Sequence, residues 1–257
     1  MLKKLLKKID RFLNSIFISP SHLLIKFISI PLFIKNAFTY NKLSKEKKFR
    51  IRLNNILFST ADRFSSSGNV NNHYFHQDLW AAKKLYDLGI NKHVDIGSRL
   101  DGFIGHIINH ISVEYVDIRP LEISYNNLIY IYGSITDLPY SDNSVQSLSS
   151  LHVVEHIGLG RYGDQIDPAG YIKATQELTR ILAPGGKLLF STPVGRESLH
   201  FDAHRIFSPY TIIDLFKELK MLEFNLIDDK AKGIRLNVSL SEAEKCEYGC
   251  GLFLFEK

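Results

Sequence analysis

Two imidazoles, two carboxylates and a guanidinium lie between positions 152 and 164 of this sequence. They belong to the run Leu151-His-Val-Val-Glu-His156 and to the glycine-rich run that follows it. A histidine or a carboxylate can act as a general base, which removes the proton from a nucleophile. An arginine can hold a carboxylate or phosphate of a substrate. The candidate catalytic residues are His152, His156 and Glu155, in falling order, and the candidate substrate-binding residues are Arg161, Asp164, His204 and Arg205.

The same run, His152-x-x-Glu155-His156, matches the H-x-x-E-H signature of zinc proteases. That signature requires both histidines on one helix, where they face one metal ion. Here His152 is expected at the end of a strand, and Gly158 and Gly160 would cut a helix short. We therefore predict no metal ligands, and a metal-dependent hydrolase is the third functional alternative.

A second stretch, His93–Gly105, passes from a short apolar run through Gly97 into an apolar periodic segment. This order is typical of a strand, a tight turn and a helix start, where a nucleotide-like ligand binds in open α/β sheets. Asp117 follows Asp95 by 22 residues, a spacing at which an acid binds ribose hydroxyls. A purely structural turn is the alternative for Gly97, and a turn or cap role is the alternative for Asp137. The candidate ligand-binding residues are Asp95, Gly97, Ser98, Arg99, Asp117, Ser134 and Asp137.

Alternating strand and helix patterns indicate the elements that hold these residues. They predict an α/β fold: a Rossmann-like, doubly wound, mostly parallel sheet of seven strands. The last strand follows the sixth without a helix between them, so we expect it to run antiparallel. Helices are predicted from Asp78 to Gly89 and at 103–110, 170–182 and 208–219, and strands at 92–96, 113–117, 128–132, 145–151, 186–192, 222–228 and 251–255.

Charge is distributed unevenly along the 257 residues. Residues 1–50 carry a net charge of +10, and the remainder carries −5. A nucleic-acid-binding domain would show a basic face on the fold itself, so no nucleic-acid partner is expected. The two cysteines, Cys246 and Cys250, are too few for a disulfide framework or a four-cysteine zinc site, and we expect two reduced thiols.

The N-terminal segment 1–50 begins with apolar residues at helical spacing between positions 2 and 17, and lysines fill the opposite face. Such a helix suits an anionic membrane surface, although packing on its own domain is the alternative. The apolar run from Ile18 to Phe38 is interrupted by prolines and lysines and does not predict a transmembrane helix. We expect a cytoplasmic protein, peripheral at the inner face of a membrane through residues 1–40. Residues 51–77 form a predicted lead-in and lid-like loop, and 78–257 the α/β domain.

The sequence from residue 78 onward resembles the class I S-adenosylmethionine-dependent methyltransferases. The resemblance rests on Asp95-Ile-Gly97, Asp117, Asp137-Leu-Pro139, Glu155-His156 and Leu182-Ala-Pro-Gly-Gly186. More narrowly, it is similar to the family called "domain of unknown function 268". That likeness rests on His93-Val-Asp-Ile-Gly-Ser98, Asp101-Gly-Phe103, Glu155-His-Ile-Gly-Leu-Gly-Arg-Tyr-Gly-Asp164, Ala203-His-Arg205 and Tyr248-Gly-Cys-Gly251.

The resemblance implies a Rossmann-like fold, S-adenosylmethionine as cofactor and methyl transfer. We expect the acceptor to be a hydroxyl or similar nucleophile, and the predicted membrane-surface N-terminus suggests a glycan or another small polar molecule. One position departs from the methyltransferase pattern: Arg99 stands where the loop usually has its second glycine. Its side chain could crowd the cofactor or pair with the cofactor carboxylate. The alternative function is a non-catalytic, membrane-associated scaffold or regulator, in which the site between Gly97 and Asp117 would be blocked.

Overall fold

The structure is a computed structural model that describes residues 20–44, 51–52, 56–57, 70 and 72–257. The predicted basic helix at 2–17 lies outside these residues, as do parts of the predicted lead-in and lid-like loop at 51–77. The chain divides into two units, Met1–Asn69 and Val70–Lys257.

In the first unit, the described helix is α2 (Pro20–Leu43), which continues through Pro31. Large apolar side chains on this helix are exposed, including Phe27 at 70% and Phe38 at 74%. Among the described residues, no helix combines the length and the apolar character needed to cross a membrane.

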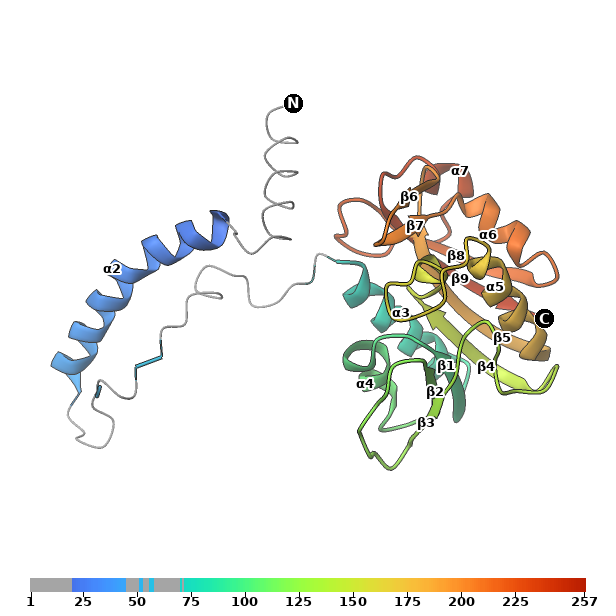
Figure 1. Cartoon of the computed structure of the whole chain (residues 1–257), viewed down its shortest axis with the longest axis horizontal. Helices are drawn as coiled ribbons and strands as arrows, with labels where there is room; N and C mark the ends of the chain where they lie inside the picture. Colours follow the sequence, from blue (N-terminus) through green and yellow to red (C-terminus); the bar gives the residue numbers. More distant parts are fainter. Residues whose placement is uncertain (1–19, 45–50, 53–55, 58–69, 71) are drawn as a thin grey trace. The chain divides into compact units, whose positions relative to one another are not determined.

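The second unit is built on a seven-stranded sheet in the order β3-β2-β1-β4-β5-β9-β8, shown in Figure 1. Neighbouring strands from β3 to β5 pair in parallel, whereas β9 pairs antiparallel with both β5 and β8. The predicted doubly wound, mostly parallel sheet is therefore confirmed. The strands are β1 (Lys92–Ile96), β2 (Ser112–Asp117), β3 (Leu128–Tyr132), β4 (Val145–Leu151), β5 (Leu182–Val194), β8 (Lys220–Ile227) and β9 (Gly249–Glu256).

Helices cover both faces of the sheet because alternate strand residues are apolar on both sides. On one face, Leu188 and Phe190 pack in a cluster with residues of α5 (Gly170–Ile181), α6 (Pro209–Leu215) and α7 (Leu240–Ala243). On the other face, Leu189 packs in a cluster with residues of α3 (His73–Asp87), η3 (Leu100–Ile104) and α4 (Gly105–Ile107). A short turn, η4 (Val154–His156), follows β4.

Helix α3 begins five residues before the predicted start at Asp78. Its first turn is capped by Asn72, whose side chain accepts a hydrogen bond from the backbone N–H of Phe75. The predicted end is confirmed, because Gly89 adopts a left-handed φ of +66° after the last turn.

The structure differs from the prediction in two other places. The helix predicted at 103–110 is reduced to η3 and α4, and Gly102 inside η3 has non-helical dihedral angles. A Cβ at Gly102 would lie 2.2 Å from a carboxylate oxygen of Asp78, so the chain turns closely around that side chain. A hairpin of β6 (Ser198–His200) and β7 (His204–Ile206), which was not predicted, brings the backbone of Ala203 to the turn after β4.

Candidate active site

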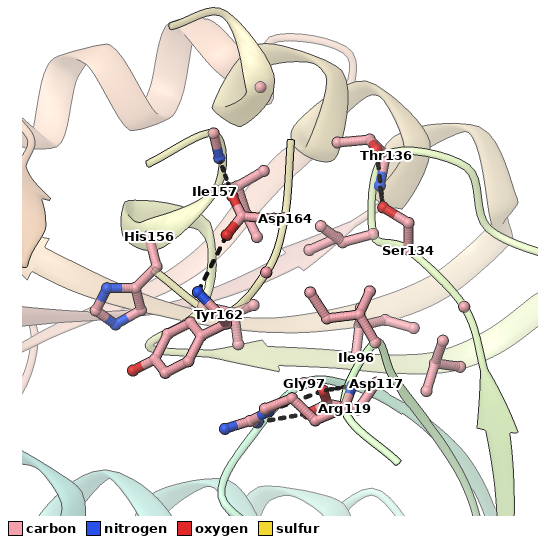
Figure 2. Close-up of a pocket in the computed structure, with 18 of the residues that line it drawn as sticks. Ile96, Gly97, Asp117, Arg119, Ser134, Thr136, His156, Ile157, Tyr162 and Asp164 are labelled. Atoms are coloured by element: carbon pink, nitrogen blue, oxygen red, sulfur yellow. Dashed lines mark hydrogen bonds and ion pairs between the residues drawn. The ribbon is translucent and has the colours of Figure 1, made fainter. Parts of the chain in front are cut away.

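A cavity of about 820 Å³ lies at the carboxyl ends of β1, β2, β3 and β4. This edge of an open α/β sheet is where ligands bind, and the volume is in the range of small-molecule sites. Figure 2 shows side chains from several loops around this space. The walls comprise Tyr74, Ile96, Gly97, Arg99, Val116–Arg119, Tyr132–Thr136, Leu151–Val153, His156–Gly158, Tyr162–Gln165, Asp167, Gly170 and Lys173.

The Gly97 turn forms one wall and requires glycine. Gly97 has a φ of +71°, and a Cβ there would lie 3.1 Å from a methyl group of Val153. Behind the turn, Asp95 is fully buried and accepts hydrogen bonds from the backbone N–H and the hydroxyl of Ser98 and from the Ser149 hydroxyl. Burial raises the pKa of Asp95 to about 7. Asp95 and Ser98 therefore shape the loop from behind, and neither lines the cavity.

Arg99 lies on the cavity wall without closing the space between Gly97 and Asp117. Its guanidinium forms an ion pair with Asp101, with 2.6 Å between Nη2 and Oδ2, and lies 4.9 Å from the ring centre of Tyr74. The blocked site expected for a non-catalytic scaffold is not seen.

Asp117 is the last residue of β2, and both oxygens of its carboxylate accept hydrogen bonds from neighbouring residues. Its Oδ1 accepts from the backbone N–H and Nε of Arg119, and its Oδ2 accepts from Nη2 of Arg119 and from the Tyr115 hydroxyl. Burial opposes ionisation of Asp117, but the hydrogen bonds from Arg119 hold the pKa of the carboxyl below its usual value. The Arg119 guanidinium also lies 5.0 Å from the ring centre of Tyr162. An ionised carboxylate thus faces the cavity beneath an arginine.

The two candidate residues after β3 differ in position. Ser134 lines the cavity, and its hydroxyl lies 2.9 Å from that of Thr136. Asp137 is exposed and does not line the cavity, although its backbone N–H bonds to the Ser134 carbonyl.

The turn after β4 brings the three predicted catalytic side chains together. Glu155 is buried between two imidazoles: its Oε1 lies 2.5 Å from Nδ1 of His152 and 3.8 Å from Nε2 of His156. Burial opposes ionisation of Glu155, but His152 and His156 lower the pKa of its carboxyl below the usual value. His152 and His156 line the cavity, whereas Glu155 does not.

The hydrogen bonds of His152 and His156 determine which ring has a nitrogen that can accept a proton from a ligand in the cavity. Nδ1 of His156 lies 2.6 Å from the Ala203 carbonyl oxygen, which can only accept, so Nδ1 carries a proton. The neutral ring then has its lone pair on Nε2, where it can accept a proton. In His152, Nδ1 is engaged by Glu155 and Nε2 is buried. The geometry therefore favours His156 over His152 as a general base.

The four predicted substrate-binding residues mostly support the loops around the cavity. Asp164 lines the cavity and accepts hydrogen bonds from the backbone N–H groups of Gly158, Gly160 and Tyr162, two of which appear in Figure 2. The other three do not line the cavity: Arg161 donates to the Ala203 carbonyl, Arg205 donates to the Ile157 carbonyl, and the ring of His204 packs against His200 and Tyr248.

The cavity residues that sequence reasoning missed include three side chains that bear on its chemistry. Tyr74 comes from the helix before the sheet, Arg119 lies two residues beyond Asp117, and Tyr162 lies in the glycine-rich run. Only Tyr162 had a sequence signal, since it lies within a passage already singled out. Of the pair considered from the sequence, His152 belongs to a group of three potential metal ligands in the described part of the chain, and His156 does not.

Comparisons with known proteins agree with this architecture. A proposed sarcosine dimethylglycine methyltransferase from Galdieria sulphuraria is 18% identical, with a TM-score of 0.51, over 70% of this chain and 84% of that one. A 1,6-didemethyltoxoflavin-N1-methyltransferase from Burkholderia thailandensis, solved with S-adenosylhomocysteine, is 13% identical, with a TM-score of 0.51, over 71% and 79%. The [4+2]-cyclase SpnF is 11% identical, with a TM-score of 0.51, over 69% and 80%. At these identities the likeness shows the fold.

No curated protein matches the sequence. Residues 127–248 match a family model described as "Caenorhabditis protein of unknown function, DUF268". This segment holds the catalytic candidates and two of the five passages on which the narrow resemblance rests, Glu155–Asp164 and Ala203–Arg205. The predicted likeness to the domain of unknown function 268 is therefore confirmed over residues 127–248, on a chain with the class I methyltransferase fold.

Proposed function

We propose that the cavity binds S-adenosylmethionine and that the protein is a methyltransferase. The observation that carries this proposal is the open cavity between Gly97 and Asp117, at the edge of the sheet where this fold binds ligands. Gly97 lets a ligand approach the backbone closely, and the Asp117 carboxylate can accept hydrogen bonds from ribose hydroxyls once Arg119 withdraws. Ser134 and Thr136 offer hydroxyls from the loop after β3. The bound cofactor would supply an electrophilic methyl group.

The chain's own residues would position and deprotonate the acceptor. Nε2 of His156 is the proposed base, because the Ala203 carbonyl holds the proton on Nδ1. Glu155, 3.8 Å from that Nε2, would stabilise the positive charge that the ring gains. A general base contributes typically about 10²–10⁴-fold to a rate. We propose a hydroxyl of a glycan or another small polar molecule as acceptor, since a hydroxyl requires such a base.

The first experiment is a thermal-shift titration of the full chain with S-adenosylmethionine and S-adenosylhomocysteine. A ligand at 100 times its Kd adds about 2.7 kcal/mol to the free energy of unfolding. For a domain of this size we expect a rise in Tm of about 5–10 °C. Asp117→Asn should reduce the shift at the same ligand concentration by about half or more, and Asp137→Asn, the matched change outside the cavity, should keep it. No shift with either ligand at millimolar concentration would overturn the proposal.

A second candidate function, a non-catalytic scaffold or regulator, is favoured by one observation. The Asp117 carboxylate is fully occupied by Arg119 and Tyr115, so a ribose must displace a side chain before it can bind. The fold likeness also includes a [4+2]-cyclase, which is a reminder that the fold does not fix the reaction. Absence of S-adenosylmethionine and S-adenosylhomocysteine binding by the wild-type chain would favour this alternative.

We also propose that the N-terminal segment associates with the inner face of a membrane. Exposed Phe27 and Phe38 on α2, together with the net charge of +10 over residues 1–50, support association with an anionic lipid surface. The full chain should sediment with anionic vesicles and less with neutral ones, and Phe27→Ser with Phe38→Ser should weaken this binding. Equal sedimentation with both kinds of vesicle would contradict it.

A further inference from the structure

Three metal-ligating side chains meet beside the cavity, in a cluster that was not predicted from the sequence. His73 is the first residue of α3, His152 follows β4, and Cys250 lies in β9. One donor atom from each residue lies within 4.8 Å of the other two. All three residues are buried, with exposed fractions of 8%, 7% and 0%.

One nitrogen in this cluster lacks a partner. His152 Nε2 is buried and makes no hydrogen bond to any residue that the structure describes. A buried polar atom left in this way destabilises the folded state unless something satisfies it. On the other side of the same ring, Nδ1 is bonded to the Glu155 carboxylate. Histidines that bind metals usually have this arrangement, with the second nitrogen held by a carboxylate and the free lone pair directed at the ion.

The other two groups suit a soft metal ion. The ring of His73 is buried, and imidazole nitrogen is a ligand that zinc and related metal ions accept. That ring is stacked between His152 and Tyr248, with centroid separations of 5.4 Å and 4.9 Å, which fixes its orientation. The Cys250 thiol makes long contacts, 3.8 Å to the Gly251 carbonyl and 4.0 Å to Oε1 of Gln77. None of these contacts competes strongly for the sulfur.

We propose that His73, His152 and Cys250 form a binding site for a divalent transition-metal ion, with zinc as the expected occupant. Imidazole nitrogen and thiolate sulfur are both ligand types that zinc takes in proteins, and a site with three protein ligands can hold water at the fourth position. Tetrahedral bond lengths of about 2.0–2.3 Å place neighbouring donor atoms about 3.4–3.6 Å apart. The cluster, with its atoms within 4.8 Å of one another, would contract by at most about 1.2–1.4 Å. Binding releases the thiol proton of Cys250.

Another use of these side chains is less consistent with the structure. Cys250, His152 and Glu155 follow the order of a thiol nucleophile, its base and the group that orients the base. However, Cys250 is completely buried, so a substrate could not reach its sulfur. A metal ion needs no such access once the protein has folded around it. The ion would connect α3 to β9 and to the turn after β4 and, through His152, adjoin the cavity. This site does not depend on S-adenosylmethionine binding.

The test uses the full chain, without an affinity tag, refolded with one equivalent of Zn²⁺ or Co²⁺. Bound zinc is measured by mass spectrometry after gel filtration, and cobalt by its absorption spectrum. We expect one ion per chain and, with cobalt, a thiolate-to-metal charge-transfer band. Cys250→Ser should remove that band and weaken zinc binding at least about 100-fold, more than the loss of a supporting group costs. His73→Gln should weaken zinc binding similarly, and Cys246→Ser is the matched control that should behave like the wild type.

Each outcome decides the proposal. If the wild type binds no metal, or binds cobalt without a charge-transfer band, the site does not exist. If Cys250→Ser keeps the band, the sulfur ligand lies elsewhere and the proposal is wrong. Circular dichroism of each variant without metal separates loss of a ligand from loss of the fold. Should Cys250→Ser fail to fold, the charge-transfer band of the wild type and the weaker metal binding of His73→Gln still decide the question.

Discussion

Replacing Arg119 by alanine should tighten the binding of S-adenosylmethionine, although the arginine lies in the cavity. In the unliganded protein its Nε and Nη2 occupy acceptor positions on Asp117 that ribose hydroxyls would use. A ligand must therefore exchange these contacts for its own. Alanine removes them and keeps the backbone N–H that also bonds to Asp117.

The size of the effect follows from exposure. The Arg119 side chain is 51% exposed, whereas that of Asp117 is 6% exposed. An ion pair that is half open to water contributes on the order of 0.2–1 kcal/mol. Removing the competing side chain should therefore lower the Kd up to about 5-fold. Asp117→Asn removes a charged acceptor, worth about 1.5–3 kcal/mol, and should raise the Kd about 10–150-fold.

Calorimetric titration of the two variants and their double mutant tests this reasoning. If Arg119 acts only by occupying Asp117, Arg119→Ala should have little effect in the Asp117→Asn background, so the two changes will not be additive. Weaker binding in Arg119→Ala alone would refute the argument, because it would mean that the guanidinium holds the ligand itself. The outcome therefore shows whether Arg119 competes with the ligand for Asp117 or binds the ligand itself.

Other predictions concern stability. Burial holds the pKa of Asp95 near 7, above its unfolded value of about 3.8, so the contribution of Asp95 to the free energy of unfolding falls as the pH rises from 4 to 7. In urea unfolding, the stability of Asp95→Asn relative to wild type should therefore rise by up to about 1.4 kcal/mol per pH unit over this range, and a constant difference would contradict this. Gly158→Ala places a Cβ 1.8 Å from the Asp167 carbonyl oxygen and should lower Tm by about 5 °C or more, whereas Gly163→Ala, with open space around it, should cost about 1–2 kcal/mol. Glu155→Gln breaks the buried pair with His152 and should cost about 3–5 kcal/mol in denaturant unfolding; a cost below 1 kcal/mol would mean that the pair is not charged.

Much of the fold could be predicted because its strands are short apolar runs between turn residues. All seven strands of the main sheet appear near their predicted positions, including the antiparallel last strand. Local patterns failed where a tertiary contact determined the backbone. The helix at 103–110 is shortened where Gly102 passes against Asp78, which is distant in sequence. The β6–β7 hairpin has strands of only three residues, too short for a periodic signal.

The candidate site was predictable where its residues come from strand ends. Gly97, Asp117, Ser134, His152, His156 and Asp164 line the cavity because parallel strands deliver their carboxyl ends to one edge. The sequence does not show which group an arginine side chain will bind. Arg161 and Arg205, predicted to bind substrate, donate to backbone carbonyls of neighbouring loops. The cluster of His73, His152 and Cys250 could not be read from the sequence, since 177 residues separate its first member from its last.

The position of β9 has a consequence for how the sheet is completed. This strand is the last in the chain, yet it lies between β5 and β8 and is almost entirely buried. Until residues 249–256 have left the ribosome, both neighbouring strands present unpaired edges and apolar side chains to the cell. A nascent or prematurely terminated chain would therefore be open to aggregation and would need chaperone protection during that interval.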